Sequence, residues 1–219
     1  MKDSNTCPHC RQRNRIEDAR CGSCSQTIVL PADGAISLWR LGPIRDGLVG
    51  ILAQAITDAL SIPCVIQPAF MDERPSLRPD WNGISSNVFL RQTLSRCRKR
   101  EVAALGITEK NIVPSASYNF LFGYAYLGLP AATASIHPLV QDDPPEDLLV
   151  ERLAKIALHE LGHAFGLDHH SYEEEKDCLM VGDEKVDCTD EVDSGGIRFC
   201  EECAAGIERN RRVRMAKRA

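Results

Sequence analysis

The stretch HELGHAFGLDHHSYEEEKDCLM, residues 159–180, concentrates side chains that bind metals and move protons. His159 and His163 are four residues apart, so on a helix their rings lie on the same face, one turn apart, and can bind a single ion. Glu160 lies beside them, where its carboxylate can contact a zinc-bound water without being a ligand itself. These three residues predict a hydrolytic metal site in which Glu160 is the general base.

A third ligand is predicted where this helix ends. Gly166 allows the chain to leave the helix through a backbone conformation that other residues disfavour, and the turn brings His169 back toward the first two histidines. Three imidazoles leave a fourth position open for water, as a catalytic zinc ion requires. The full pattern HExxHxxGxxH is much more specific than HExxH alone, so we expect His159, His163 and His169 to hold one catalytic zinc. His137 stands alone at the end of a predicted strand, and we expect it to be structural.

Six of the ten cysteines form CxxC pairs, a spacing that lets two thiolates share one tetrahedral ion: Cys7/Cys10, Cys21/Cys24 and Cys200/Cys203. The first two pairs lie in residues 1–30, a segment with so little apolar content that bound metal must supply its folding energy. We therefore predict that this segment is a short zinc ribbon with one zinc ion on its four cysteines. Two disulfides are the alternative.

The polar N-terminus, MKDSNTCPHCRQRNR, lacks the apolar core of a signal peptide. We therefore expect a reducing, cytoplasmic location, where cysteines more often bind metal or pack than form disulfides. Cys64 and Cys97, which lie outside the CxxC pairs, are expected to be small buried residues. No run of the sequence approaches the ~18 apolar residues of a membrane span, so we expect no membrane association.

Length and charge limit the domain organisation and the partners. The 219 residues (24.2 kDa, 43% hydrophobic) suffice for one catalytic domain, predicted over residues 31–219, after the ribbon-like segment of residues 1–30. A net charge of −5 and a pI of about 5.7 argue against a general nucleic-acid-binding protein. The ribbon and a basic C-terminal tail are the remaining routes to nucleic acid, and we expect the tail to be a solvated, frayed end: Arg209, Arg211, Arg212, Arg214, Lys217 and Arg218. The sequence leaves the oligomeric state open.

Strand and helix patterns alternate along the chain, which predicts an α/β fold with at least part of the sheet parallel. The expected order is strand 36–44, helix 46–61, strand 64–70, a helix from about Ile84 to Leu105, and two strands within residues 117–139. A last helix starts at Pro144 and Pro145, keeps one side apolar and ends at the Gly166 break. This helix carries the catalytic motif.

The long motif, followed by Met180, resembles the metzincin metalloproteases, in which a methionine turn forms a hydrophobic floor beneath the zinc-binding histidines. Within that clan the chain is similar to the archaemetzincins over roughly residues 36–205, and the ribbon-like segment lies outside the similarity. Four further segments carry the resemblance: LGIT at 105–108, YNFLFGYA at 118–125, CLM at 178–180 and FCEEC at 199–203. The resemblance implies a metzincin-like zincin fold with a mixed, twisted sheet and a catalytic-motif helix.

The resemblance also implies a second, structural zinc site with four ligands close to the catalytic one. Cys178, Cys200 and Cys203 match three of the family's cysteines. His170 stands where the family has its fourth cysteine, and three cysteines with one histidine form an ordinary structural zinc site. Cys188, in a loop longer than the family's, is the alternative fourth ligand. We favour His170 because it keeps its place in the chain.

The residues and the resemblance together predict a zinc peptidase that binds three zinc ions and cleaves a peptide or protein substrate. Glu160 would accept a proton from zinc-bound water as that water attacks the scissile carbonyl, and would then donate it to the leaving amine. In metzincins an extended substrate pairs with the edge strand of the sheet, and the matching segment is about Asn119 to Ala125. Gly123 within it would either let the substrate backbone approach closely or mark a simple bulge.

Two questions of function stay open. The sequence does not separate endopeptidase from aminopeptidase activity. The alternative to an enzyme is a catalytically weak or inactive, zinc-stabilised adaptor that acts through its ribbon and basic tail. Glu160 argues against the adaptor, because a pure scaffold needs no general base.

Overall fold

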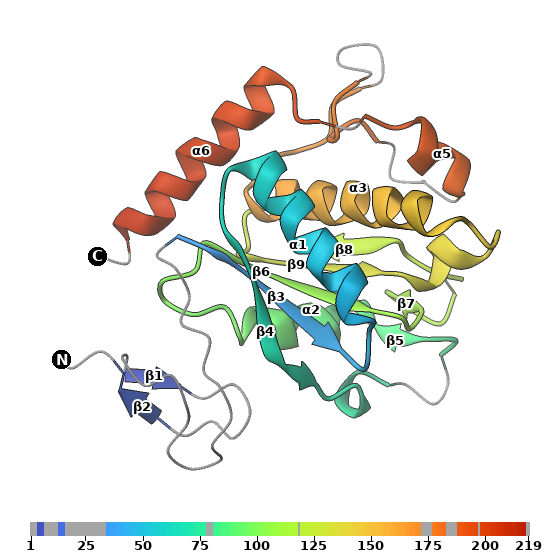
Figure 1. Cartoon of the computed structure of the whole chain (residues 1–219), viewed down its shortest axis with the longest axis horizontal. Helices are drawn as coiled ribbons and strands as arrows, with labels where there is room; N and C mark the ends of the chain where they lie inside the picture. Colours follow the sequence, from blue (N-terminus) through green and yellow to red (C-terminus); the bar gives the residue numbers. More distant parts are fainter. Residues whose placement is uncertain are drawn as a thin grey trace.

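The computed structural model of the chain (Figure 1) describes residues 4–6, 13–15, 34–77, 81–117, 119–171, 177–182, 188–196 and 198–217. A five-stranded sheet forms its centre, with strands in the order β4-β3-β6-β9-β8. Four of the strands run parallel, and β8 pairs antiparallel with β9 at one edge. The strand bounds are Ile36–Leu41 for β3, Cys64–Met71 for β4, Ala103–Thr108 for β6, Gly123–Ala125 for β8 and Ala131–Ser135 for β9. The sheet is therefore mixed and mostly parallel, as predicted.

Helices cover both faces of this sheet (Figure 1). Helix α1 (Asp46–Leu60) and helix α3 (Glu146–Ala164) share the larger hydrophobic core with one face. Helix α2 (Ser86–Leu94) packs on the other face, where Phe89 lies in a second core with Trp39 and Ile112. A parallel sheet buried on both faces needs this arrangement, because its strands have no solvated side.

Shorter elements connect these layers. They are the two-strand pair β5 (Ile84–Ser85) with β7 (Ile112–Val113), the 3-10 helices η1 (Arg74–Ser76) and η2 (His137–Val140), and helix α5 (Thr189–Ser194). The 16-residue helix α6 (Glu201–Ala216) follows α5 in the chain. Near the N-terminus, β1 (Ser4–Thr6) pairs antiparallel with β2 (Arg13–Arg15). Among the helices of the described residues, none has the length and apolar character needed to cross a bilayer.

The helix predicted from about Ile84 to Leu105 is wrong in its second half. Helix α2 ends at Leu94, and Ala103–Thr108 forms β6, the central strand between β3 and β9. All six residues of β6 are buried, so the strand shows no alternation of apolar and polar residues. A short apolar run of this kind cannot be told from a buried helix by periodicity, and its alanine and leucine favour a helix when read locally.

The basic tail is also not a frayed end. The tail from Arg209 to Ala216 is part of helix α6, and Arg214 is partly buried against the rest of the protein. The expectation for the two isolated cysteines is confirmed, because Cys64 and Cys97 are partly buried and pack against the two cores. Burial raises the pKa of the Cys64 thiol to about 12.

A buried arginine fixes helix α5 against the first half of α3. The guanidinium of Arg152, whose residue is 2% exposed, donates hydrogen bonds to both carboxylate oxygens of Asp142 and of Asp193, at 2.7–2.8 Å. It also donates to the carbonyl of Leu139. These charge-assisted bonds hold the pKa of both aspartates below its ordinary value. The catalytic-motif helix is thereby anchored at the end opposite its histidines.

Candidate active site

Three histidine rings converge near the C-terminal end of α3. The Nε2 atoms of His159, His163 and His169 lie 3.0–3.1 Å from one another. A tetrahedral zinc ion with ordinary Zn–N distances places its ligand nitrogens about 3.3 Å apart. The spacing of the three rings therefore suits one shared ion.

Backbone carbonyls set the tautomer of two of these rings. The Nδ1–H of His159 donates to the carbonyl of Leu179 (2.7 Å), and the Nδ1–H of His163 donates to the carbonyl of Leu167 (2.9 Å). Because a carbonyl can only accept, the proton lies on Nδ1 and the Nε2 lone pair is free for a metal. Burial lowers the pKa of His159 to about 3 and lowers that of His163 as well, which keeps both rings neutral. Neutral imidazole is the form that binds zinc.

A single glycine brings the third histidine to the other two. Helix α3 ends at Ala164, and Gly166 takes a φ of +89°, in the left-handed region that L residues disfavour. Its N–H bonds to the carbonyl of His163, and the N–H of Leu167 bonds to that of Gly162. This helix-ending turn reverses the chain so that His169 faces the helix it has just left.

Glu160 lies between α3 and the edge strand β8. A β-carbon placed on Gly123 of β8 would lie 2.7 Å from the Glu160 Cδ, so the glutamate side chain occupies the space above this glycine. The sequence suggested that Gly123 admits a substrate backbone or marks a bulge, and neither interpretation includes this contact with Glu160. Burial raises the pKa of Glu160 to about 8, and a cation held by the three imidazoles would favour the carboxylate and lower that pKa again.

A second cluster lies next to the first in the chain. The ligand atoms of His170, Cys178, Cys200 and Cys203 all lie within 4.8 Å of one another. The Sγ atoms of Cys178 and Cys203 are 3.8 Å apart, and the His170 Nε2 lies 3.0 Å from the Sγ of Cys203 and 3.5 Å from that of Cys200. Thiolates on one tetrahedral zinc are expected about 3.8 Å apart. The donor set and its spacing therefore fit a structural zinc ion.

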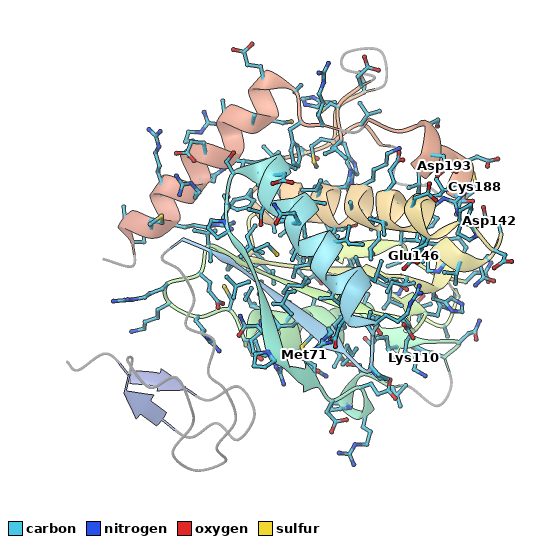
Figure 2. The ribbon with its side chains drawn as sticks, in the orientation of Figure 1. Met71, Lys110, Asp142, Glu146, Cys188 and Asp193 are labelled. Atoms are coloured by element: carbon cyan, nitrogen blue, oxygen red, sulfur yellow. The ribbon has the colours of Figure 1, made fainter. Side chains whose placement is uncertain are left out.

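Backbone groups support this cluster. The N–H groups of Met180 and Cys200 point at the Sγ of Cys178, at 3.4 and 3.3 Å, and such donors favour a thiolate. Burial raises the pKa of Cys203, so a cation is needed for its thiolate to persist at neutral pH. Cys188, the alternative fourth ligand, is exposed and is the N-cap of α5 (Figure 2). Of the two candidates that the sequence left open, the structure brings only His170 into the cluster.

The segment Cys178–Met180 connects the two clusters. The thiol of Cys178 belongs to the second cluster, while the carbonyl of the next residue, Leu179, orients His159 in the first. Met180 is fully buried and packs under α3, where its sulfur contacts Gly162, and its carbonyl accepts the N–H of His170. A methionine floor beneath the histidines is what the family resemblance implies.

The four ribbon cysteines, Cys7, Cys10, Cys21 and Cys24, lie outside the described residues. Strands β1 and β2 flank the first CxxC pair, and their antiparallel pairing is the described part of this segment. The zinc ribbon and its domain boundary stay predictions.

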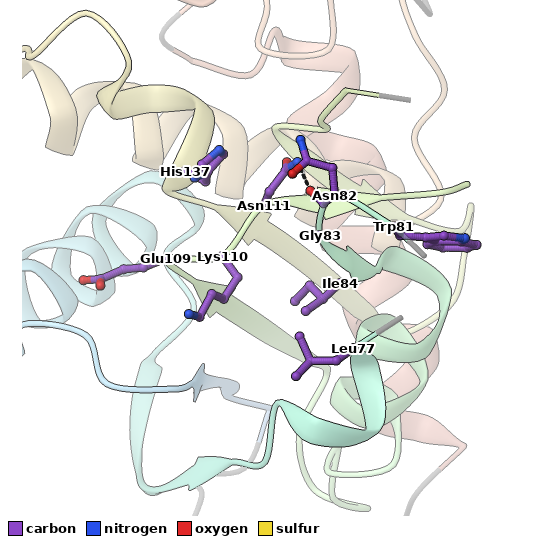
Figure 3. A pocket seen from close by; sticks show the side chains of 9 residues that line it. All are labelled: Leu77, Trp81, Asn82, Gly83, Ile84, Glu109, Lys110, Asn111 and His137. Atoms are coloured by element: carbon purple, nitrogen blue, oxygen red, sulfur yellow. Dashed lines mark hydrogen bonds between the residues drawn. The ribbon is translucent and has the colours of Figure 1, made fainter. Parts of the chain in front are cut away.

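An open cavity of about 450 Å³ lies where β5 and β7 meet the turn after β6 (Figure 3). Its lining includes Lys110, Asn111 and His137 but none of the catalytic-motif residues. The Asn111 amide donates to the carbonyls of Asn82 and Asn119, both at 2.6 Å. Asn111 therefore fixes the start of the segment that leads into edge strand β8. Among the described residues, no grouping of metal ligands lies at this cavity.

Comparison with known proteins places this geometry in a known class. Residues 95–209 match the model of peptidase family M54. The archaemetzincin of Archaeoglobus fulgidus is 37% identical over 125 residues, which are 55% of this chain and 72% of that protein. The archaemetzincin of Pyrococcus horikoshii is 38% identical over 112 residues, 49% of this chain and 56% of that protein.

Solved structures of related peptidases share the fold of this chain. The crystal structure of the Archaeoglobus fulgidus archaemetzincin, complexed with malonate, covers 78% of this chain and 99% of that one, with a TM-score of 0.64 and 28% identity. A zinc-dependent peptidase from Methanocorpusculum labreanum shares the fold, with a TM-score of 0.66 at 22% identity. The class that these matches define is the zinc metallopeptidases. Within it, the chain belongs to peptidase family M54, the archaemetzincins.

Proposed function

We propose that the chain hydrolyses peptide bonds at the site formed by His159, His163 and His169, with Glu160 as general base. One observation carries this proposal: three Nε2 lone pairs meet within 3.1 Å. The residue after His159 in the same helix is the partly buried Glu160, whose side chain packs against Gly123 of edge strand β8. Polar atoms withdrawn from water normally have a partner, and a cation between the three unprotonated nitrogens would supply one to each of them.

The chain's own groups supply the proton transfers. When bound by the three imidazoles, zinc supplies Lewis-acid chemistry that polarises a carbonyl and makes water acidic near neutral pH. Glu160 accepts the proton of the attacking water at its carboxylate and donates it to the nitrogen of the leaving amine. A carboxyl pKa raised by burial and lowered by a nearby cation suits both tasks, because the group must gain and lose a proton near neutral pH.

Edge strand β8 supplies the peptide-binding surface. It is the last strand of the sheet, and Glu160 packs against its Gly123, so a peptide paired with β8 would lie beside the general base. Backbone pairing gives affinity with little dependence on side chains. We therefore assign extended peptide segments of proteins or oligopeptides as the substrate class.

This assignment can be tested with an internally quenched peptide library. We expect the zinc-loaded chain to cleave members of the library, and a chelator to abolish cleavage until zinc is restored. Peptides with a blocked amino terminus distinguish endopeptidase from aminopeptidase activity. An endopeptidase cleaves such peptides, and an aminopeptidase does not. A fully zinc-loaded chain that cleaves nothing would instead support the adaptor function.

We further propose three zinc ions per chain: one at the three histidines, one at His170 with Cys178, Cys200 and Cys203, and one in the ribbon. Elemental analysis of the purified protein is expected to give three zinc ions. The Cys203→Ser variant is expected to give two, because one thiolate of a closed four-ligand site is lost. Its matched control is Cys188→Ser, which changes an exposed cysteine away from the cluster and should leave three. A loss of zinc in the control, or none in Cys203→Ser, would reassign the second site.

A further inference from the structure

Helix α6 is held to the protein at both of its ends. Its first turn carries Cys203 of the second cluster, and Cys200 is its N-cap. Its last turn carries Arg214, whose guanidinium reaches back to the catalytic-motif helix. No sequence pattern indicates this role, because the acceptors are backbone carbonyls far away in the chain.

Arg214 joins three separate segments. It donates to the carbonyl of Val102, just before the central strand β6 (2.8 Å), and to the carbonyl of Gly128, in the loop after edge strand β8 (3.1 Å). It also bonds to the carbonyl of Ala164, the last residue of α3, and lies over the ring of Phe165 with 4.9 Å to the centroid. A guanidinium at a helix C-terminus satisfies free carbonyls and complements the helix dipole.

The peptide groups of Gly128 are held from two directions. Its N–H donates to the carbonyl of His163 (2.8 Å), and its carbonyl accepts from Arg214. The loop that follows β8 is thus tied directly to a zinc-ligand candidate on one side and to α6 on the other. These two bonds hold the loop after β8 at the end of α3. The strand itself is also held by its pairing with β9 and by the hydroxyl of Tyr124, which donates to Asn87 of α2.

We propose that Arg214 is a positioning residue for peptide hydrolysis: it holds the end of β8 against the end of α3, so that the backbone groups of β8 stay in place to pair with a peptide substrate. This inference rests on the proposed function. The planar, rigid guanidinium of arginine can bind several carbonyls at once, so it holds these segments together better than the flexible ammonium group of lysine would. The neighbouring Arg212 differs, because its side chain is 77% exposed and pairs with Glu208 of the same helix.

The test compares Arg214→Ala and Arg214→Lys with the matched control Arg212→Ala, using zinc-saturated protein and a peptide that the parent chain cleaves. For Arg214→Ala we expect KM to rise about tenfold with kcat changed less than about twofold, because β8 binds substrate and transition state alike. Arg214→Lys should restore part of the loss, since an ammonium can still reach one or two of the carbonyls. Arg212→Ala should match the parent.

The outcomes separate positioning from bulk stability. A purely structural role would lower the melting temperature and leave KM of the folded protein unchanged, and that result would overturn the inference. If Arg214→Ala does not fold, the Arg214→Lys variant tests the inference instead. Faster hydrogen exchange at the Gly128 amide together with a raised KM supports it. Parental values of both quantities overturn it. If the parent chain itself cleaves no peptide, the proposed function fails and this inference with it. An active parent with an unchanged Arg214→Ala variant overturns this inference alone.

Discussion

Replacing Glu160 with glutamine is expected to lower kcat by roughly 10²–10⁴-fold, the usual contribution of a positioned general base, while zinc content stays at the parental value. Glutamine has the same shape and fits the space above Gly123, but its amide cannot accept the proton of water. The three histidines that we propose as zinc ligands are untouched by the change. The value of kcat is measured with a peptide that the parent chain cleaves, and zinc content is measured by elemental analysis of the same preparation.

The same variant makes a prediction about stability. Glutamine replaces the carboxyl group with a neutral amide of the same shape, so the packing against Gly123 is kept and the melting temperature should stay close to the parental value. Glu146→Gln is the matched control: it makes the same chemical change on the same helix, at an exposed first-turn position. Parental turnover by Glu160→Gln, or an equal loss of activity in Glu146→Gln, would contradict the general-base role.

Replacing Gly123 with alanine is expected to lower kcat about 100-fold, the order of loss that a displacement of about 1 Å in a catalytic group can cause. The added methyl group would overlap the Glu160 carboxyl group, so that side chain must leave its place between α3 and β8. The three atoms nearest to the added methyl group all belong to Glu160, not to a proposed metal ligand, and zinc content should be unchanged. The measurement is kcat with zinc stoichiometry as its companion.

Gly47→Ala is the control for this substitution. Gly47 lies in helix α1, where a β-carbon meets nothing within 4 Å, so the change should be neutral for activity and neutral or slightly favourable for the helix. An unchanged kcat in Gly123→Ala would mean that the Glu160 carboxylate can act as general base from another position. A loss of zinc in that variant would mean that β8 supports the metal site itself.

The sequence predicted the parts of this site that depend on local geometry. His159 and His163 meet because a helix repeats every 3.6 residues, and His169 joins them through the turn at Gly166, so spacing alone indicated their juxtaposition. The second cluster is different. Cys178, His170 and the Cys200/Cys203 pair come from separate segments, and only resemblance to a family suggested that they lie together.

Three features were missed for one physical reason, which is that they depend on contacts between distant segments. Strand β6 resembled a helix because burial on both faces removes the alternation that marks a strand. The contact of Glu160 with Gly123 depends on how far α3 lies from the sheet edge. The role of Arg214 depends on carbonyl groups, which every residue carries and no sequence pattern marks.

The shortness of edge strand β8 has a consequence for the protein's behaviour in a crowded solution. A free strand edge can pair with any extended chain, including an unfolding neighbour, and long edges are sites of aggregation. Among the described residues, Gly123–Ala125 are the ones that pair with β9 in this strand, and so short a ladder gives little affinity without further contacts. An extended chain should therefore stay bound only when its scissile bond also engages the metal site, which protects the sheet edge from unproductive partners.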